Sequence, residues 1–234
     1  MVIIVKEIKE KKPDYFMTDE EVKLLWKYST DKWSSKFSTM IAFALCRGMR
    51  VGEIVAINIT DFNRDFTKLR VIFEKSHIED WLPLMPELTD IVKEYITKNR
   101  PFKDGYLFSF YSSKGKAPHM TAGVAEAFFS KMRKIIGKDH PGFLEKRKFS
   151  NGYEKYRITF HSCRRWFETR IHDNIKNKKK LADIMRYIDA STVDTYLNPY
   201  ETWKEEKNIL KSTFENYFVM FNDFSKGQMK LTMF

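Results

Sequence analysis

The sequence predicts a mostly α-helical fold with a small antiparallel β-sheet, of the α+β class. Apolar residues recur at three- and four-residue spacing along most of the chain, which is typical of helices with one buried face. The stretch 69–84 reads instead as two β-strands joined by a tight turn. With 43% hydrophobic and 31% charged residues, the chain has the composition of a globular protein and not of a disordered one.

The N-terminal half begins with a short arm, which we assign to residues 1–16. Thr18 and Glu21 form a capping box at the start of the first expected helix. A second helix covers about 33–47, and Gly48 is a natural stop for it. After the two strands, the patterns predict a helix at 87–98, a short strand at 105–109 and a helix at 121–136.

The C-terminal half opens with a polar, basic segment, 139–157, that we interpret as a long loop or arm. Thr159 is expected to cap a helix of about 160–173. The remaining patterns predict a helix at 178–187, a short helix carrying Tyr196 and a last helix at 202–222. One stripe of that last helix is strongly apolar and contains Trp203, Leu210, Phe214, Tyr217, Phe218 and Phe221.

The net charge indicates the class of binding partner, and the two cysteines indicate the redox state of the cell compartment. A formal net charge of +11 favours a polyanion partner, although a lysine-rich surface kept for solubility is the alternative. Cys46 and Cys163 lie in apolar helical patterns without metal-ligand spacing, so we expect buried free thiols in a reducing compartment. Because no apolar run approaches the roughly 18 residues of a membrane span and the start does not resemble a secretory signal, we expect an intracellular protein without membrane contact.

Two short motifs carry candidate chemistry. In "CRGMRVGEI", Arg50 follows the helix-ending Gly48 and Glu53 lies three residues further on. In "TFHSCRRWF", His161 and Arg164 are three residues apart, so both emerge on one face of the expected helix. Each motif alone is weak, because a helix with one His and one Arg occurs by chance in many basic proteins.

The full order is more specific. It runs through an Arg, a Lys at the hairpin turn, a His-x-x-Arg pair and a downstream Tyr, and it resembles the catalytic domain of the tyrosine recombinases, the family of phage integrases, Xer and Cre. The resemblance covers about residues 17–200, and we set 201–234 apart as a C-terminal helix and tail. Pro83 and Leu84, which end the hairpin, support it. It implies that family's catalytic-domain fold and the catalytic residues Arg50, Lys75, His161, Arg164, Tyr187 and Tyr196. Tyr187 is a departure, since the family usually has His or Trp nine residues before the nucleophile.

The chemistry of DNA strand exchange accounts for these residue types. A displaced phosphodiester gains negative charge on its non-bridging oxygens, and Arg50 and Arg164 would clamp them. His161 and Tyr187 would add hydrogen bonds to the same oxygens. Tyr196 would be the nucleophile that forms a 3′-phosphotyrosine, and Lys75 would protonate the leaving 5′-hydroxyl.

Several assignments have alternatives. Glu53 is expected to hold Arg50 or His161 in place, or only to offset nearby charge. Tyr200 and Tyr217 are alternative nucleophiles, and Tyr196 could be a packed aromatic. We expect phosphate contacts from four further basic residues, which could instead face only solvent: Arg47, Arg165, Lys178 and Lys179.

The resemblance also implies partners. We expect double-stranded DNA and a homotetramer on two DNA sites, with a monomer in the absence of DNA as an alternative. No metal, cofactor or ATP is expected, because the arginines replace a metal ion and the sequence shows neither a two-metal carboxylate cluster nor a glycine-rich phosphate loop. Since only about 16 residues precede the catalytic domain, where the family usually has a DNA-clamping domain, we expect weak, salt-sensitive binding.

Two rival functions and one structural alternative remain open. A type IB topoisomerase-like enzyme shares the Arg, Lys, His and Tyr chemistry, and a DNA-binding protein could keep the fold without activity. The apolar stripe of the last helix either covers the chain's own core or packs on a neighbouring subunit, as the family's corresponding segment often does. We favour the second, because the stripe is long and lies at the chain end.

Overall fold

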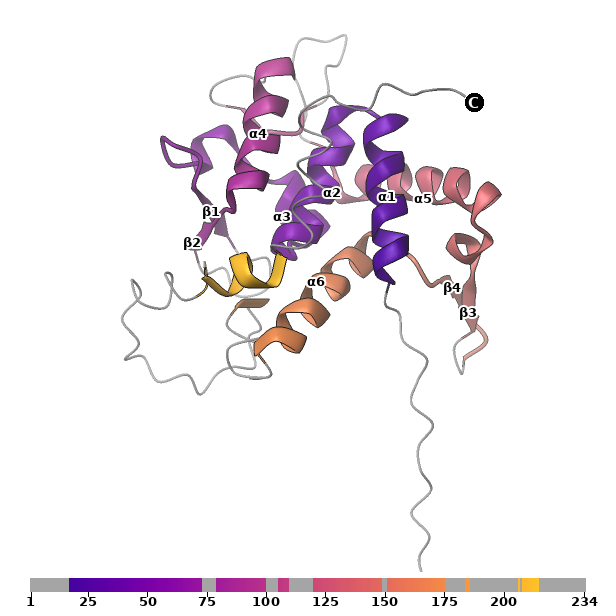
Figure 1. Ribbon diagram of the computed structural model, residues 1–234. Coiled ribbons are helices and arrows are strands. Elements are labelled where there is room, and N and C mark those ends of the chain that lie inside the picture. The colour runs from indigo at the N-terminus through magenta and orange to yellow at the C-terminus, as the bar shows by residue number, and fades with distance from the viewer. Residues whose placement is uncertain are drawn as a thin grey trace, which may run out of the picture.

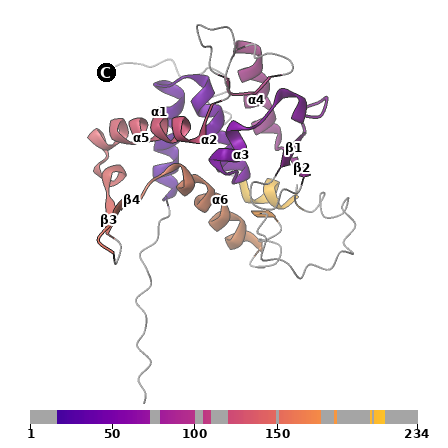
Figure 2. The ribbon, with the colours of Figure 1, turned by 180° about the vertical axis from the view of Figure 1, so that it is seen from behind.

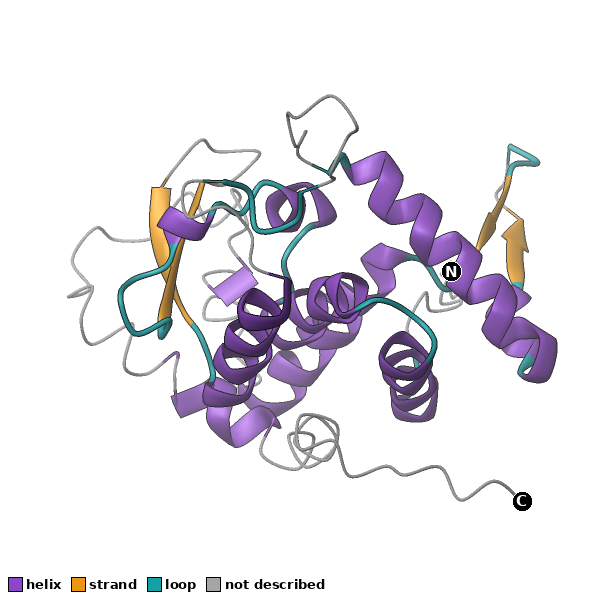
Figure 3. Ribbon diagram, turned by 90° about the horizontal axis from the view of Figure 1, so that it is seen from above, coloured by secondary structure: helices purple, strands orange, loops and turns teal. Residues whose placement is uncertain are grey.

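The computed structural model describes residues 17–72, 79–99, 105–109, 120–148, 151–175, 184–185, 206 and 208–214. Over this part of the chain it is mostly helical, with two separate two-stranded antiparallel sheets, so the predicted α+β class is confirmed. The two hairpins lie at opposite ends of the molecule, with the helical body between them (Figures 1 and 3).

The first two helices are α1 (Asp19–Asp31) and α2 (Ser35–Arg47). The predicted capping box is present at α1, where the Glu21 N–H donates to Thr18 Oγ1 over 3.2 Å and the Thr18 N–H donates to the Glu21 carboxylate over 2.9 Å. Helix α2 is buried along nearly its whole length and forms the centre of the body.

Gly48 ends α2 as predicted, in the left-handed conformation with a φ of 59°. A Cβ atom at this position would lie 2.4 Å from Cδ1 of Phe167, on the helix that packs against α2. Both the backbone angle and the close approach therefore require glycine here.

The middle of the chain forms α3 (Val51–Val55), a 3-10 turn at Ile59–Asp61, β1 (Lys68–Ile72), β2 (Glu79–Pro83) and α4 (Pro86–Asn99). The predicted hairpin is confirmed as an antiparallel pair, with Leu69 opposite Leu82 and both buried. The segment 105–109, predicted as a short strand, is not a continuous strand. Tyr106 forms an isolated bridge with Asn58, Ser109 is a second bridge residue, and the two residues between them are bends.

The next elements are α5 (Ala122–Asp139), a 3-10 turn at Pro141–Leu144, β3 (Lys146–Lys148), β4 (Glu154–Tyr156) and α6 (Phe160–Ile175). The segment 139–157, predicted as a long loop or arm, is an arm with regular structure, because 146–148 and 154–156 pair as the β3–β4 hairpin. Figure 2 shows this hairpin from the other side, extending from the body where α5 ends and before α6 begins.

The helical residues 208–214 return to the chain's own core. Leu210 and Phe214 are fully buried, and the Phe214 ring stacks on Phe167 with centroids 5.4 Å apart and contacts Trp166 at 5.8 Å. For these two residues the structure contradicts the favoured interpretation of a subunit contact, and the first alternative holds. Of the predicted helix at 178–187, Ile184 and Met185 are helical; its other residues and the Tyr196 helix lie outside the described residues.

Cys46 and Cys163 are buried free thiols, as predicted, and burial raises the pKa of both. Within the described residues, no helix combines the length and the apolarity that crossing a membrane requires.

Candidate active site

The site begins at the turn after α2, where Glu53 fixes Arg50. Arg50 is the N-cap residue of the short helix α3. Its backbone N–H donates to Glu53 Oε2 over 2.8 Å, and its guanidinium Nη1 donates to Glu53 Oε1 over 2.9 Å. The Glu53 side chain is fully buried, whereas that of Arg50 is 18% exposed. Glu53 thus makes one of the two contacts expected of it, and it holds a partly exposed cation at the surface.

The first turn of α6 carries the second motif. The Thr159 N–H donates to Ser162 Oγ over 2.9 Å, and that hydroxyl donates to the carbonyl oxygen of Arg157 over 3.1 Å. These bonds fix the residues before α6 to its first turn. His161 and Arg164 follow one turn apart, as the sequence predicted, with His161 exposed and Arg164 buried.

Arg164 joins the two motifs. Its Nη1 donates to the carbonyl oxygen of Gly48, and its Nη2 donates to the carbonyl oxygen of Met185 over 2.7 Å. Since Gly48 lies two residues before Arg50, this contact brings the start of α6 against the Arg50 turn. The side chains of both motifs therefore belong to one region of the molecule.

The positive charges near His161 come from both motifs and from the β3–β4 hairpin. Desolvation, followed by the positive charges of Arg165, Arg164, Lys155 and Arg50, lowers the pKa of His161 to about 4. The imidazole therefore carries no charge at neutral pH. A site with this charge distribution favours an anionic ligand.

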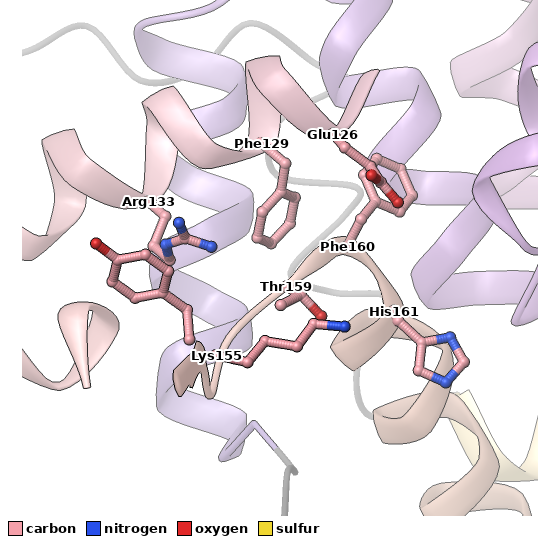
Figure 4. Close-up of a pocket in the computed structure, with 8 residues that line it drawn as sticks. Glu126, Phe129, Arg133, Lys155, Thr159, Phe160 and His161 are labelled. Atoms are coloured by element: carbon pink, nitrogen blue, oxygen red, sulfur yellow. The ribbon is translucent and has the colours of Figure 1, made fainter. Parts of the chain in front are cut away.

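A pocket of about 260 Å³ adjoins His161, and sequence reasoning missed two cations in it. Arg133 of α5 and Lys155 of β4 line it together with Glu126, Phe129, Tyr156, Thr159, Phe160 and His161 (Figure 4). Lys155 extends toward His161, whereas Arg133 stacks on Tyr156 with its guanidinium 3.6 Å from the ring centre. The signal that could have indicated Lys155 is the basic character of 139–157, the segment before "TFHSCR" that is predicted as a loop or arm; no comparable signal marks Arg133 within its helix.

One predicted role needs correction. Arg47 was expected to contact DNA phosphates or solvent, but its side chain is fully buried and pairs with Glu206. Arg164 is 2% exposed and bonds two carbonyl oxygens, and its predicted clamp on a phosphate stays a prediction. Arg165, half-buried beside His161, keeps its predicted phosphate contact as an expectation.

The other predicted site residues lie outside the described part of the chain: Lys75, Lys178, Lys179, Tyr187, Tyr196, Tyr200 and Tyr217. The described ends of β1 and β2 bracket Lys75 in sequence, and Met185 precedes Tyr187 by two residues. Over the described ranges, no group of three or more His, Cys, Asp and Glu side chains is placed to hold a metal ion.

Comparisons with known proteins identify the family and the fold. The sequence model of the phage integrase family matches residues 15–202. A comparison with curated protein sequences gives no match. Among solved structures, the chain is similar to the integrase of mycobacterium phage Brujita (15% identity, TM-score 0.56), covering 85% of this chain and 60% of that one. It is also similar to XerA recombinase (16% identity, TM-score 0.57), covering 86% of this chain and 64% of that one.

The catalytic core of lambda integrase is a third neighbour, at 15% identity and a TM-score of 0.52, with 73% of this chain covering 93% of that one. This chain thus spans less than two thirds of the phage Brujita and XerA proteins but matches nearly the whole isolated lambda core. At these identities the neighbours establish the fold, and the match to the family model establishes the family. The chain belongs to the phage integrase family and contains a tyrosine recombinase domain.

Proposed function

We propose that this chain binds double-stranded DNA and exchanges strands through a covalent bond between Tyr196 and a backbone phosphate. The observation that carries the proposal is the convergence of the Arg50 turn and the first turn of α6, joined by Arg164 at Gly48. DNA-bound relatives of the same fold support the partner, since structures of lambda integrase and of the Tn1549 transposon integrase contain DNA.

In this proposal the scissile phosphate lies against Arg50 and His161. The Arg50 guanidinium is oriented by the buried Glu53 carboxylate and donates to a non-bridging oxygen, where negative charge grows in the transition state. His161 is neutral at physiological pH, and its one N–H donates to the same phosphate. Arg164 supplies a second positive charge from behind the turn, and a direct phosphate contact would replace its bond to the Met185 carbonyl.

The covalent step uses residues assigned from the sequence. The Tyr196 hydroxyl loses its proton to solvent as its oxygen attacks phosphorus, a 3′-phosphotyrosine bond forms, and the bond from phosphorus to the 5′-oxygen breaks. Lys75 gives its proton to that oxygen, which leaves as a hydroxyl. Attack by a 5′-hydroxyl from the second DNA site reverses the step and completes the exchange. A homotetramer on two sites would supply the four tyrosines that a full exchange of two duplexes needs.

A covalent trap tests the proposal. A library of nicked duplexes with randomised sequence loses a short 5′-hydroxyl fragment on cleavage, so the adduct accumulates and survives denaturation. We expect the native chain to form an adduct that maps to the peptide carrying Tyr196. Tyr196→Phe should form none, and the matched control Tyr200→Phe should react normally. DNA binding by the native chain without any adduct would refute the proposal.

Two other outcomes identify rival functions. The buried, carbonyl-bonded state of Arg164 favours a DNA-binding protein of this fold without cleavage activity, which predicts binding but no adduct. A topoisomerase-like enzyme would relax supercoiled plasmid as a monomer and would not exchange strands between two sites.

A further inference from the structure

The β3–β4 hairpin is a basic extension of the body, and its position relative to the site gives it a further role. All three residues of β3 are basic: Lys146, Arg147 and Lys148. On β4, Lys155 is exposed and lies opposite Arg147 in the antiparallel register. Directly opposed residues share one face of a sheet, and like charges in that arrangement destabilise it. A ligand with negative charge on this face would be attracted by the charges of both side chains.

The hairpin is anchored firmly at its base. Tyr156 carries the Arg133 guanidinium 3.6 Å from its ring centre, and Arg133 Nη1 donates to the Ile158 carbonyl oxygen over 3.0 Å. Arg157, directly after β4, pairs with Glu21 of α1 and with Glu145, the latter over 2.6 Å. The two carboxylates neutralise the charge of Arg157. Lys155 has no ion-pair partner among the described carboxylates, so its charge is available to a ligand.

Lys155 lies beside the first turn of α6, which carries His161. It lines the same pocket as His161, and its amine extends toward the imidazole (Figure 4). Because the two groups lie close together, the positive charge of Lys155 is one of the causes of the lowered pKa of His161. One carboxylate, Glu126, also lines this pocket, so an anion would approach from the hairpin side.

The geometry points to a second phosphate site on the β3–β4 hairpin: we propose that Lys155, with Arg147 on the same face, binds a DNA backbone phosphate that flanks the scissile one. The inference rests on the proposed function for the identity of the duplex. Because the β1–β2 hairpin lies at the opposite end of the molecule, the two hairpins would contact the duplex on opposite sides of the cleavage position (Figures 1 and 3). Such a contact fixes the register of the domain on DNA without reading bases.

The salt dependence of binding to a short duplex of fixed sequence tests the proposal. Each lost phosphate contact reduces the slope of log affinity against log salt by about 0.9. We expect Lys155→Gln to lower the slope by about that amount between roughly 50 and 200 mM salt. Lys155→Arg should keep the native slope. Lys93→Gln, which removes an exposed lysine from α4, is the matched control and should also keep it. A native slope for Lys155→Gln, or an equal fall for Lys93→Gln, would overturn the proposal.

A footprint on the unmodified protein covers the case in which a variant fails to fold. Acetylation of lysines, mapped by mass spectrometry with and without the duplex, should be slowed by DNA at Lys155 and not at Lys93. Equal protection of both, or protection of neither, would contradict the hairpin site. Both measurements need only binding. Binding through Lys155 without a covalent adduct would therefore refute the proposed function alone, and an adduct without any Lys155 effect would refute this inference alone.

Discussion

Replacing Glu53 tests whether the Arg50 turn depends on its buried carboxylate. Glu53→Gln keeps the shape of the side chain, but an amide replaces one of two oxygens that accept bonds at 2.8 and 2.9 Å. One donor of Arg50 then faces an amide N–H, and the ion pair is lost. A bond to a charged group contributes about 1.5–3 kcal/mol, so we expect a loss of about 2 kcal/mol in the free energy of unfolding. For a chain of this length that corresponds to about 4–8 °C in Tm.

Urea denaturation of a double-mutant cycle measures this coupling. The cycle combines Glu53→Gln with Arg50→Gln, and we expect the two changes to be non-additive by at least about 1 kcal/mol. Glu53→Gln should also slow adduct formation, because a displaced guanidinium stabilises the transition state less well. Additive effects on stability, together with an unchanged adduct rate, would refute the role assigned to Glu53.

Three further measurements concern Gly48, His161 and Arg47. Gly48→Ala should destabilise the fold by about 2–4 kcal/mol in urea denaturation, since it adds left-handed strain to a 2.4 Å clash with Phe167, and native stability would contradict this. An NMR titration should place the pKa of His161 near 4. Because the unfolded chain binds a proton at higher pH, about 6.5, the free energy of unfolding should fall as the pH falls from about 6.5 to about 4. The variant His161→Gln should lack this pH-dependent loss of stability. A midpoint at or above 6.5 would contradict it. Arg47→Met should cost about 3–5 kcal/mol by leaving Glu206 without its partner, but it should not change the salt slope of DNA binding, and a lower slope would show that Arg47 reaches DNA.

The parts of the fold that follow from local chemistry could be predicted from the sequence. The capping box at Thr18 and the glycine stop at Gly48 depend on residues a few positions apart, and both are present. The β1–β2 hairpin was visible because its apolar residues and turn fit a strand pattern. The β3–β4 hairpin was not, because its strands are three residues long and mostly charged. Its anchor, Arg157 with Glu21, joins residues 136 positions apart.

In the candidate site, too, contacts between residues close in the sequence were predictable and long-range contacts were not. The contact between Arg50 and Glu53 spans three residues and was one of the alternatives predicted for Glu53. Arg47 was predicted to contact DNA phosphates or solvent. It is buried against Glu206, which lies 159 residues away, and no local sequence pattern predicts that ion pair. The bond from Arg164 to Gly48 likewise spans 116 residues and exists only in the folded chain.

A neutral scissile phosphate tests whether Arg50 neutralises the negative charge that grows on this group during cleavage. Once the covalent trap has identified a cleaved sequence, the same substrate can carry a methylphosphonate at the scissile position, which removes one negatively charged oxygen. We predict that Arg50→Ala slows adduct formation by about 10²–10³-fold on phosphate and recovers most of that loss on methylphosphonate. An equal loss on both substrates would contradict the claim.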